Sequence, residues 1–214
     1  MKLVKLNIEE FIESVDSINP TPGGGSVSAL ASSLGIALMR MVGHLTVGKK
    51  RFLKVPEEEQ VLFVKTIEEL VSIKRELIEL IDEDTNAYNE IVNAYKLPKE
   101  TNEEIALRKK KIQEGTINSI NVPYKVSLIS LNALEKMQII LKNGNPNTIS
   151  DLGVSALSLS AGIQGAAMNV LINLPGLDDE RLKKELYDSI KSLTSKTQKL
   201  TNEILDVVYN KLII

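Results

Sequence analysis

The spacing of the apolar residues constrains the fold of this chain more than any other feature of its sequence. From Ile67 to Tyr95 the apolar side chains recur at steps of three and four, which is the period of one face of an α-helix rather than of a strand. Aromatic residues, which are common in strands, make up only 4% of the chain. The pattern therefore predicts an all-α fold.

Capping and helix-breaking residues divide the chain into about six to eight helices, several of them long. Asn7 with Glu10, and Thr101 with Glu104, have the spacing of an N-cap and its reciprocal acidic partner. Pro123 is expected to kink or break a long helix near Asn121, because it removes one backbone donor. The predicted helices cover about 7–19, 26–47, 56–95, 101–143, 151–173 and the chain from 178 onward.

Length and composition suit a single domain spanning residues 1–214. With 43% hydrophobic residues, 214 residues form a sizeable core, or one long-helix domain completed by a partner subunit. Small residues on helix faces, at Ala31, Gly35, Gly162 and Gly165, allow close helix contacts. We therefore expect an antiparallel bundle that self-associates as a homodimer.

Charge and composition exclude several functional classes. The net charge of −2 creates no field that attracts nucleic acid or an anionic membrane. Cysteine is absent and His44 is the single histidine, so no metal site is expected within one chain. The acidic N-terminus does not resemble a signal peptide, and we expect no membrane-spanning stretch of ~18 apolar residues. These features predict a cytoplasmic protein.

Three successive glycines form the sharpest local motif, in the segment Pro22, Gly23, Gly24, Gly25 and Ser26. Glycines without side chains before a helix N-terminus let backbone N–H groups approach an anion. The alternative is a tight interhelical turn whose glycines only permit close packing. The segment alone supports both interpretations equally.

Asp84 is the most unusual carboxylate of the chain. It continues the apolar stripe of Leu77 and Ile81 toward Tyr88 at helical spacing, so that an acid occupies a core-facing position. Burial of a carboxylate raises its pKa toward the range useful for proton transfer. The alternative is a structural acid whose charge is satisfied by a neighbouring lysine or asparagine.

A second stripe joins small and polar residues at steps of three and four on one helix. Its members are Asp151, Ser155, Ser158, Gly162, Gly165, Asn169 and Asn173. The terminal amides offer donors and acceptors that could contact a heterocycle or orient water. The alternative is an N-cap followed by a helix–helix seam in an oligomer.

Lys49 belongs to a basic cluster, Gly48 to Arg51, that follows the predicted helix 26–47. A cation there suits the carbonyl end of the helix dipole and could bind carboxylates. A solvated last turn explains the cluster equally well.

Taken together, these segments resemble the C-terminal domain of the formiminotransferase-cyclodeaminase family. The segments that carry the resemblance are Pro22–Ser26, Leu45-Thr46-x-Gly48-Lys49, Asp84-x-x-Ala87-Tyr88, Leu97-Pro98-Lys99, Val122-Pro123, Gly144-Asn145, Ser150-Asp151 and the run from Gly165 to Leu174. Their order and spacing cover nearly the whole chain. The resemblance implies an all-helical, self-associating folate enzyme that needs no metal or redox cofactor.

The resemblance implies a cyclodeaminase, which converts 5-formiminotetrahydrofolate into 5,10-methenyltetrahydrofolate and ammonia. Because no formiminotransferase domain accompanies this chain, its substrate would come by diffusion or from a separate formiminotransferase. A methenyltetrahydrofolate cyclohydrolase acting at the same site is the first alternative. The second alternative is a non-catalytic helical oligomer that binds folate or another anion. It predicts that the residues of the stripes at Asp84 and Asn169 are fully used in packing between helices.

Within this resemblance we assign roles residue by residue. Asp84 is the expected acid/base, and Asp151 or Asn169 is its orienting partner. Lys49 is expected to bind the glutamate carboxylates of folate. The segment Pro22–Ser26 is expected to supply backbone donors, and the side chains expected to contact substrate are Tyr88 and Asn173.

Overall fold

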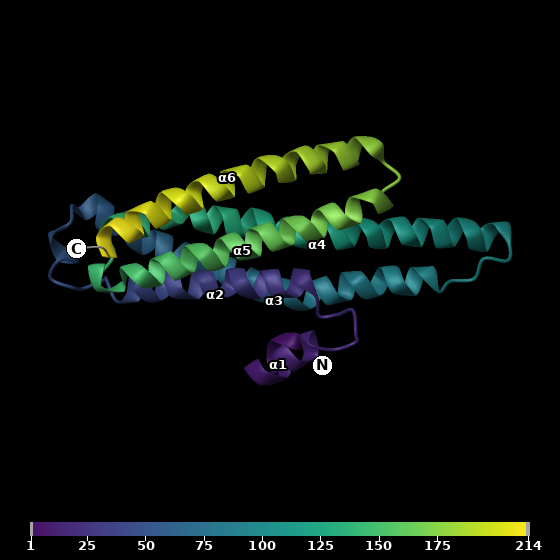
Figure 1. The fold of residues 1–214 in the computed structure, drawn as a ribbon, viewed down its shortest axis with the longest axis horizontal. Coiled ribbons are helices and arrows are strands. Elements are labelled where there is room, and N and C mark those ends of the chain that lie inside the picture. Colours follow the sequence, from purple (N-terminus) through teal and green to yellow (C-terminus); the bar gives the residue numbers. More distant parts are fainter. Residues whose placement is uncertain (1, 213–214) are drawn as a thin grey trace.

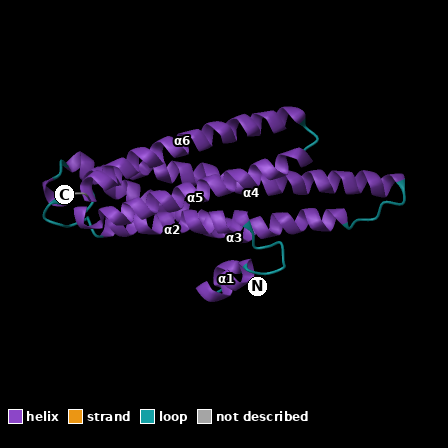
Figure 2. Ribbon diagram, viewed as in Figure 1, coloured by secondary structure: helices purple, strands orange, loops and turns teal. Residues whose placement is uncertain are grey.

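The computed structural model describes residues 2–212, and within them the chain forms six α-helices and no strand (Figure 2). The helices are α1 (Ile8–Val15), α2 (Gly24–His44), α3 (Glu57–Tyr95), α4 (Asn102–Asn143), α5 (Ile149–Asn173) and α6 (Glu180–Leu212). Short 3₁₀ turns cover Leu3–Lys5, Phe52–Lys54, Pro146–Thr148 and Leu174–Gly176. The predicted all-α fold and the number of helices are confirmed.

Helices α2 to α6 form an elongated bundle (Figure 1). The two longest helices, α3 and α4, pack against each other and project beyond the N-terminal end of α2 as a two-helix arm (Figure 1). Helix α1 lies apart from the bundle. It is tied to α3 by the 3₁₀ turn before it, where the Leu3 N–H donates to Asp82 Oδ1 over 2.6 Å.

Both predicted capping boxes are present. The Asn7 side chain accepts from the Glu10 N–H while Glu10 accepts from the Asn7 N–H, and Thr101 and Glu104 make the same reciprocal pair. Helix boundaries are less well predicted. Helix α1 ends at Val15 rather than near residue 19, and α2 runs from Gly24 to His44 rather than over 26–47.

Of the predicted kink or break at Pro123, the break is wrong, because α4 continues through this residue. A proline has no N–H to donate to the carbonyl four residues earlier, which is that of Ser119. Asn173 Nδ2, from the end of α5, donates to this carbonyl over 3.1 Å. A side chain from another helix therefore replaces the lost backbone bond.

The predicted small-residue face is mainly a contact within one chain. A Cβ at Gly162 would lie 2.1 Å from Ser32 Oγ, and a Cβ at Gly35 would lie 2.9 Å from the Ser155 carbonyl oxygen. Ser155 Oγ also donates to the Gly35 carbonyl over 2.5 Å. These glycines therefore bring α2 and α5 into close contact rather than presenting a seam to a second subunit.

A different face of the same two helices is exposed and apolar. Its large side chains are Val27, Leu34 and Met41 on α2 with Leu45 at its C-cap, and Val154, Leu157, Met168 and Ile172 on α5. At 3.6 residues per turn each set lies along one side of its helix. We call these eight residues the α2–α5 apolar face.

Two segments are long and apolar enough to span a membrane by length and composition alone, contrary to the expectation from sequence. They are Gly24–His44 and Pro146–Gly176, with mean hydropathies of 1.4 and 1.3. About half of each is buried inside the bundle (56% and 50%), as in core helices that pack on several neighbours.

Candidate functional site

Asp84 lies on α3 opposite the N-terminus of α2. Its Oδ2 accepts from the Ser26 N–H over 2.8 Å and from Ser26 Oγ over 3.0 Å. Ser26 Oγ is also 2.9 Å from the Ile81 carbonyl oxygen and 3.4 Å from Thr85 Oγ1. The anion at the predicted helix N-terminal site is therefore a carboxylate of the protein itself.

The glycine at position 25 makes this contact possible. A Cβ there would lie 1.9 Å from Asp84 Oδ1 and 2.4 Å from Asp84 Cγ, so no side chain fits. Both interpretations of the glycine segment are thus partly correct, since Gly25 permits close packing and the packed group is an acid. Backbone N–H groups of Gly24 and Gly25 have no intrahelical acceptor at this end of α2.

Burial raises the pKa of Asp84 above its ordinary value, and hydrogen bonds from the Ser26 side chain and backbone partly offset the effect. No lysine, arginine or histidine among residues 2–212 forms an ion pair with Asp84. The lysine partner of the structural alternative is therefore not present within residues 2–212, and the Ser26 N–H and hydroxyl satisfy the carboxylate instead. A half-buried carboxylate held by donors and no cation is suited to accept and return a proton.

The structure brings Asn169 to the same end of the bundle as Asp84. A Cβ at Gly24 would lie 3.0 Å from Asn169 Nδ2, so this amide lies directly against the start of α2. Asn169 Nδ2 donates to the Gly165 carbonyl over 2.8 Å, while its Oδ1 remains available as an acceptor. Two orienting partners were predicted, Asp151 and Asn169. Within one chain, only Asn169 of these two lies beside the Asp84 site.

Two other predicted residues lie at the same end. Tyr88 follows Asp84 one turn along α3 and its side chain is 37% exposed. Asn173 follows Asn169 on α5, but its Nδ2 is committed to the carbonyls of Ser119 and Asn169. Asn173 therefore shapes the site by joining α5 to α4, and only its Oδ1 is left for a substrate.

The remaining predicted residues of the glycine segment form its turn. The Thr21–Pro22 peptide bond is cis, and Pro22 is buried. The Gly23 carbonyl accepts the first intrahelical bond of α2, from the Val27 N–H over 3.0 Å. These two residues therefore direct the chain into α2.

Asp151 and Lys49 do not lie beside Asp84 in one chain. Asp151 is in the first turn of α5, about 27 Å along that helix from Asn169. Lys49 follows the C-terminal end of α2, a helix about 31 Å long, while Asp84 lies at its N-terminal end. A site containing all three residues requires a second subunit.

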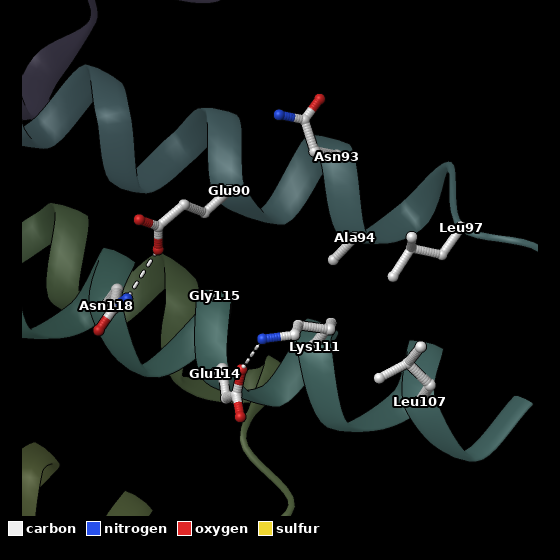
Figure 3. Close-up of a pocket in the computed structure, with 9 residues that line it drawn as sticks. All are labelled: Glu90, Asn93, Ala94, Leu97, Leu107, Lys111, Glu114, Gly115 and Asn118. Atoms are coloured by element: carbon white, nitrogen blue, oxygen red, sulfur yellow. Dashed lines mark hydrogen bonds and ion pairs between the residues drawn. The ribbon is translucent and has the colours of Figure 1, made fainter. Parts of the chain in front are cut away.

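A groove of about 540 Å³ between α3 and α4 lies on another face of the arm (Figure 3). Its α3 residues Glu90 and Ala94 are displaced by about 80–120° around the helix from Asp84. Its polar groups bond to one another: Lys111 Nζ donates to Glu114 over 2.8 Å, and Asn118 Nδ2 donates to Glu90 over 2.7 Å (Figure 3). This groove is therefore separate from the Asp84 site.

Sequence reasoning missed Thr85 and Ser119, whose contributions depend on contacts between distant helices. Residues 2–212 contain no cluster of three or more acidic or histidine side chains that could hold a metal ion. The site that remains is a half-buried acid with hydroxyl and amide neighbours.

The fold and this site define a class, namely an elongated helical bundle with a half-buried carboxylate where α2, α3 and α5 meet. The sequence model of the formiminotransferase-cyclodeaminase family matches residues 7–192. The chain belongs to this family. The predicted resemblance is confirmed.

Named relatives agree with this membership. The chain is 36% identical to a methenyltetrahydrofolate cyclohydrolase of Methylorubrum extorquens, with 95% of this chain and 96% of the relative covered. It is 34% identical to the formimidoyltransferase-cyclodeaminase of Gallus gallus, with 92% of this chain but only 36% of the relative covered. The crystal structure of a formiminotetrahydrofolate cyclodeaminase from Thermotoga maritima has the same fold, with a TM-score of 0.86 at 23% identity over 99% of this chain and 100% of that one.

Proposed function

We propose that the protein hydrolyses 5,10-methenyltetrahydrofolate to 10-formyltetrahydrofolate. The observation that supports this most is the Asp84 carboxylate, half-buried without a cation and held on the N-terminus of α2. Burial raises its pKa, which suits the group to accept a proton and return it. The full-length similarity to a methenyltetrahydrofolate cyclohydrolase favours this reaction over the cyclodeaminase reaction expected from sequence.

In this mechanism water adds to the methenyl carbon while Asp84 takes a proton from it, giving a tetrahedral adduct. The bond between this carbon and N5 then breaks as Asp84 returns the proton to N5 and the hydroxyl of the adduct loses its own proton to solvent, which forms the carbonyl of the formyl group. The formyl group stays on N10. Asn169 orients the water through its free Oδ1, and the N–H groups of Gly24 and Gly25 stabilise the developing oxyanion.

The cyclodeaminase reaction is the second candidate, favoured by the 34% identity to formimidoyltransferase-cyclodeaminases. Here N10 attacks the formimino carbon of 5-formiminotetrahydrofolate, and Asp84 transfers the N10 proton to the leaving nitrogen. Ammonia departs and the methenyl bridge forms. A separate formiminotransferase would supply the substrate. Neither reaction assigns a step to a metal or redox cofactor.

The absorbance of the methenyl bridge tests both candidates in one assay. With methenyltetrahydrofolate as substrate, the cyclohydrolase proposal expects the absorbance to disappear faster than in a blank. With formiminotetrahydrofolate as substrate, the cyclodeaminase reaction would make the absorbance of the methenyl bridge appear together with ammonia. No acceleration of either reaction would leave a non-catalytic folate- or anion-binding oligomer as the function.

We further propose that the active form is a homodimer formed through the α2–α5 apolar face. Eight large apolar side chains exposed on two adjacent helices form a patch that a second copy would cover. A twofold axis perpendicular to the helices places the C-terminal end of α2 beside the N-terminal end of the partner's α2. This arrangement would bring Lys49 of one subunit to the end of the partner's bundle that holds Asp84.

Light scattering at micromolar concentration should therefore give twice the 23.6 kDa of one chain. Leu34→Asp, at the centre of the α2–α5 apolar face, should shift the mass toward the monomer because it buries an unpaired charge in the dimer. Leu53→Asp is the control, since Leu53 is 62% exposed and outside this face. A folded wild-type monomer would exclude a site shared between subunits.

Lys49→Ala is expected to raise KM while leaving kcat nearly unchanged. A cation that binds the remote glutamate of folate contributes equally to the ground state and the transition state. Steady-state kinetics with methenyltetrahydrofolate measure the effect, and Lys54→Ala provides a matched loss of charge nearby. A collapse of kcat at constant KM would instead move Lys49 to the reacting carbon.

A further inference from the structure

Arg108, in the second turn of α4, is a cation without a carboxylate partner. Its neighbours are paired, because Lys109 contacts Asp178 over 3.1 Å and Lys111 contacts Glu114 over 2.8 Å. No ion pair among residues 2–212 includes Arg108. Its Nε is buried with no hydrogen-bond partner. Arg108 therefore differs from the solvated lysines that follow it.

The guanidinium is held in place by the end of α3. Its Cζ lies 5.5 Å from the centre of the Tyr95 ring, and its Nη2 donates to the Tyr95 carbonyl over 3.2 Å. Stacking on an aromatic ring fixes the plane of the guanidinium. With Nε buried and one Nη2 N–H bonded to a carbonyl, the remaining N–H groups on Nη1 and Nη2 are free for a carboxylate.

Arg108 lies at the far end of the stripe that begins with Asp84. At 3.6 residues per turn, Asp84, Tyr88, Ile91 and Tyr95 share one side of α3 and span about 16 Å. Tyr88 and Tyr95 are 37% and 56% exposed, so their rings are open to a ligand. The arm of α3 and α4 extends past the first residue of α2. In that part of the arm, α2 does not cover the side of α3 that carries the two tyrosines (Figure 1).

The dimensions of the stripe match a folate. Its p-aminobenzoyl ring and glutamate together extend about as far as three or four residues of extended chain, ~10–14 Å. With the one-carbon bridge at Asp84, the aromatic ring would lie along Tyr88 and the glutamate would reach the guanidinium.

We propose that Arg108 binds a carboxylate of the substrate's glutamate and so selects glutamated folates. The inference rests on the proposed function, because it places the reacting bridge at Asp84. A glutamate has two carboxylates, so Arg108 and a Lys49 of the second subunit are compatible. A forked guanidinium suits bidentate binding of a carboxylate.

The test compares 5,10-methenyltetrahydrofolate with 5,10-methenyltetrahydropteroate, which lacks the glutamate. Arg108→Ala should raise KM for the folate roughly 10- to 100-fold, the scale of a lost charge-assisted pair, and leave KM for the pteroate unchanged. Arg108→Lys keeps the charge but loses the fork, so its KM should be intermediate. Lys110→Ala, an exposed cation two residues away, should match the wild type for both substrates.

A purely structural role for Arg108, capping the last carbonyls of α3, predicts a different result. In that case Arg108→Ala would lower the melting temperature and change KM equally for both substrates. Equal changes in KM for the two substrates, or no change for either, would overturn the proposal. Calorimetric binding of tetrahydrofolate and tetrahydropteroate repeats the comparison without turnover. A wild-type protein that binds folate more tightly than pteroate but catalyses neither reaction would refute the proposed function and leave the Arg108 site supported.

Discussion

Asp84→Asn is expected to lower kcat by roughly 100-fold or more, the usual effect of losing a positioned acid or base. Asparagine keeps the size of the side chain and can still accept from the Ser26 N–H, but it cannot take up and return a proton. Steady-state rates with methenyltetrahydrofolate and formiminotetrahydrofolate measure the loss. Near wild-type rates with both substrates in a folded, dimeric variant would rule out Asp84 as the acid/base and turn attention to Asp151.

The same variant has an expected effect on stability that separates chemistry from unfolding. Because the pKa of Asp84 is raised in the folded state, its contribution to folding is complete below its unfolded pKa, near 3.8, and is lost as pH rises through the folded pKa. Asparagine never ionises. Asp84→Asn should therefore melt no lower than the wild type at pH 7 to 8, and any advantage should disappear toward pH 4. A much lower melting temperature at pH 8 would instead indicate that the carboxylate stabilises the fold.

Gly25→Ala is expected to lower kcat almost as much as Asp84→Asn. The new Cβ would overlap Asp84 Oδ1 at 1.9 Å, and the carboxylate cannot move away without losing the bonds from Ser26. The acid is then displaced from the N-terminus of α2 although its chemistry is unchanged. Activity assays combined with a melting curve at the same pH measure this effect.

Gly153→Ala is the matched control for this substitution. Its Cβ would approach Val208 Cγ1 at 3.1 Å, in the contact between α5 and α6 at the other end of the bundle. It should change the melting temperature with little effect on kcat. If Gly25→Ala kept wild-type kcat, Asp84 would not need its position on α2.

The fold was largely predictable because its helices depend on local signals. The capping boxes at Asn7 and Thr101 each involve residues three apart, and both are present. Pro123 was misjudged because the group that compensates for it, Asn173, lies 50 residues away in the chain and on another helix. The low helix propensity of proline reflects its missing N–H, but it does not take account of a donor that another helix supplies.

The site was predictable in its chemistry but not in its assembly. Asp84 was identified because an acid interrupts an apolar stripe, and the stripe is visible in one helix. Gly25 leaves room for the Asp84 carboxylate because of the way α2 crosses α3. No local pattern in the sequence records this crossing. Lys49 and Asp151 are separated from Asp84 by the length of a helix, so sequence order alone did not show that one chain keeps them apart.

The hydrogen bond between Asn173 and the carbonyl of Ser119 couples the substitutions that are tolerated at positions 123 and 173. While Pro123 is present, Ser119 lacks a backbone donor and an amide at 173 satisfies it. A descendant that regained an N–H at 123 would free the amide at 173, whereas one that lost the amide first would leave a carbonyl unsatisfied. Divergence along this lineage should therefore replace the proline before the asparagine, or both together.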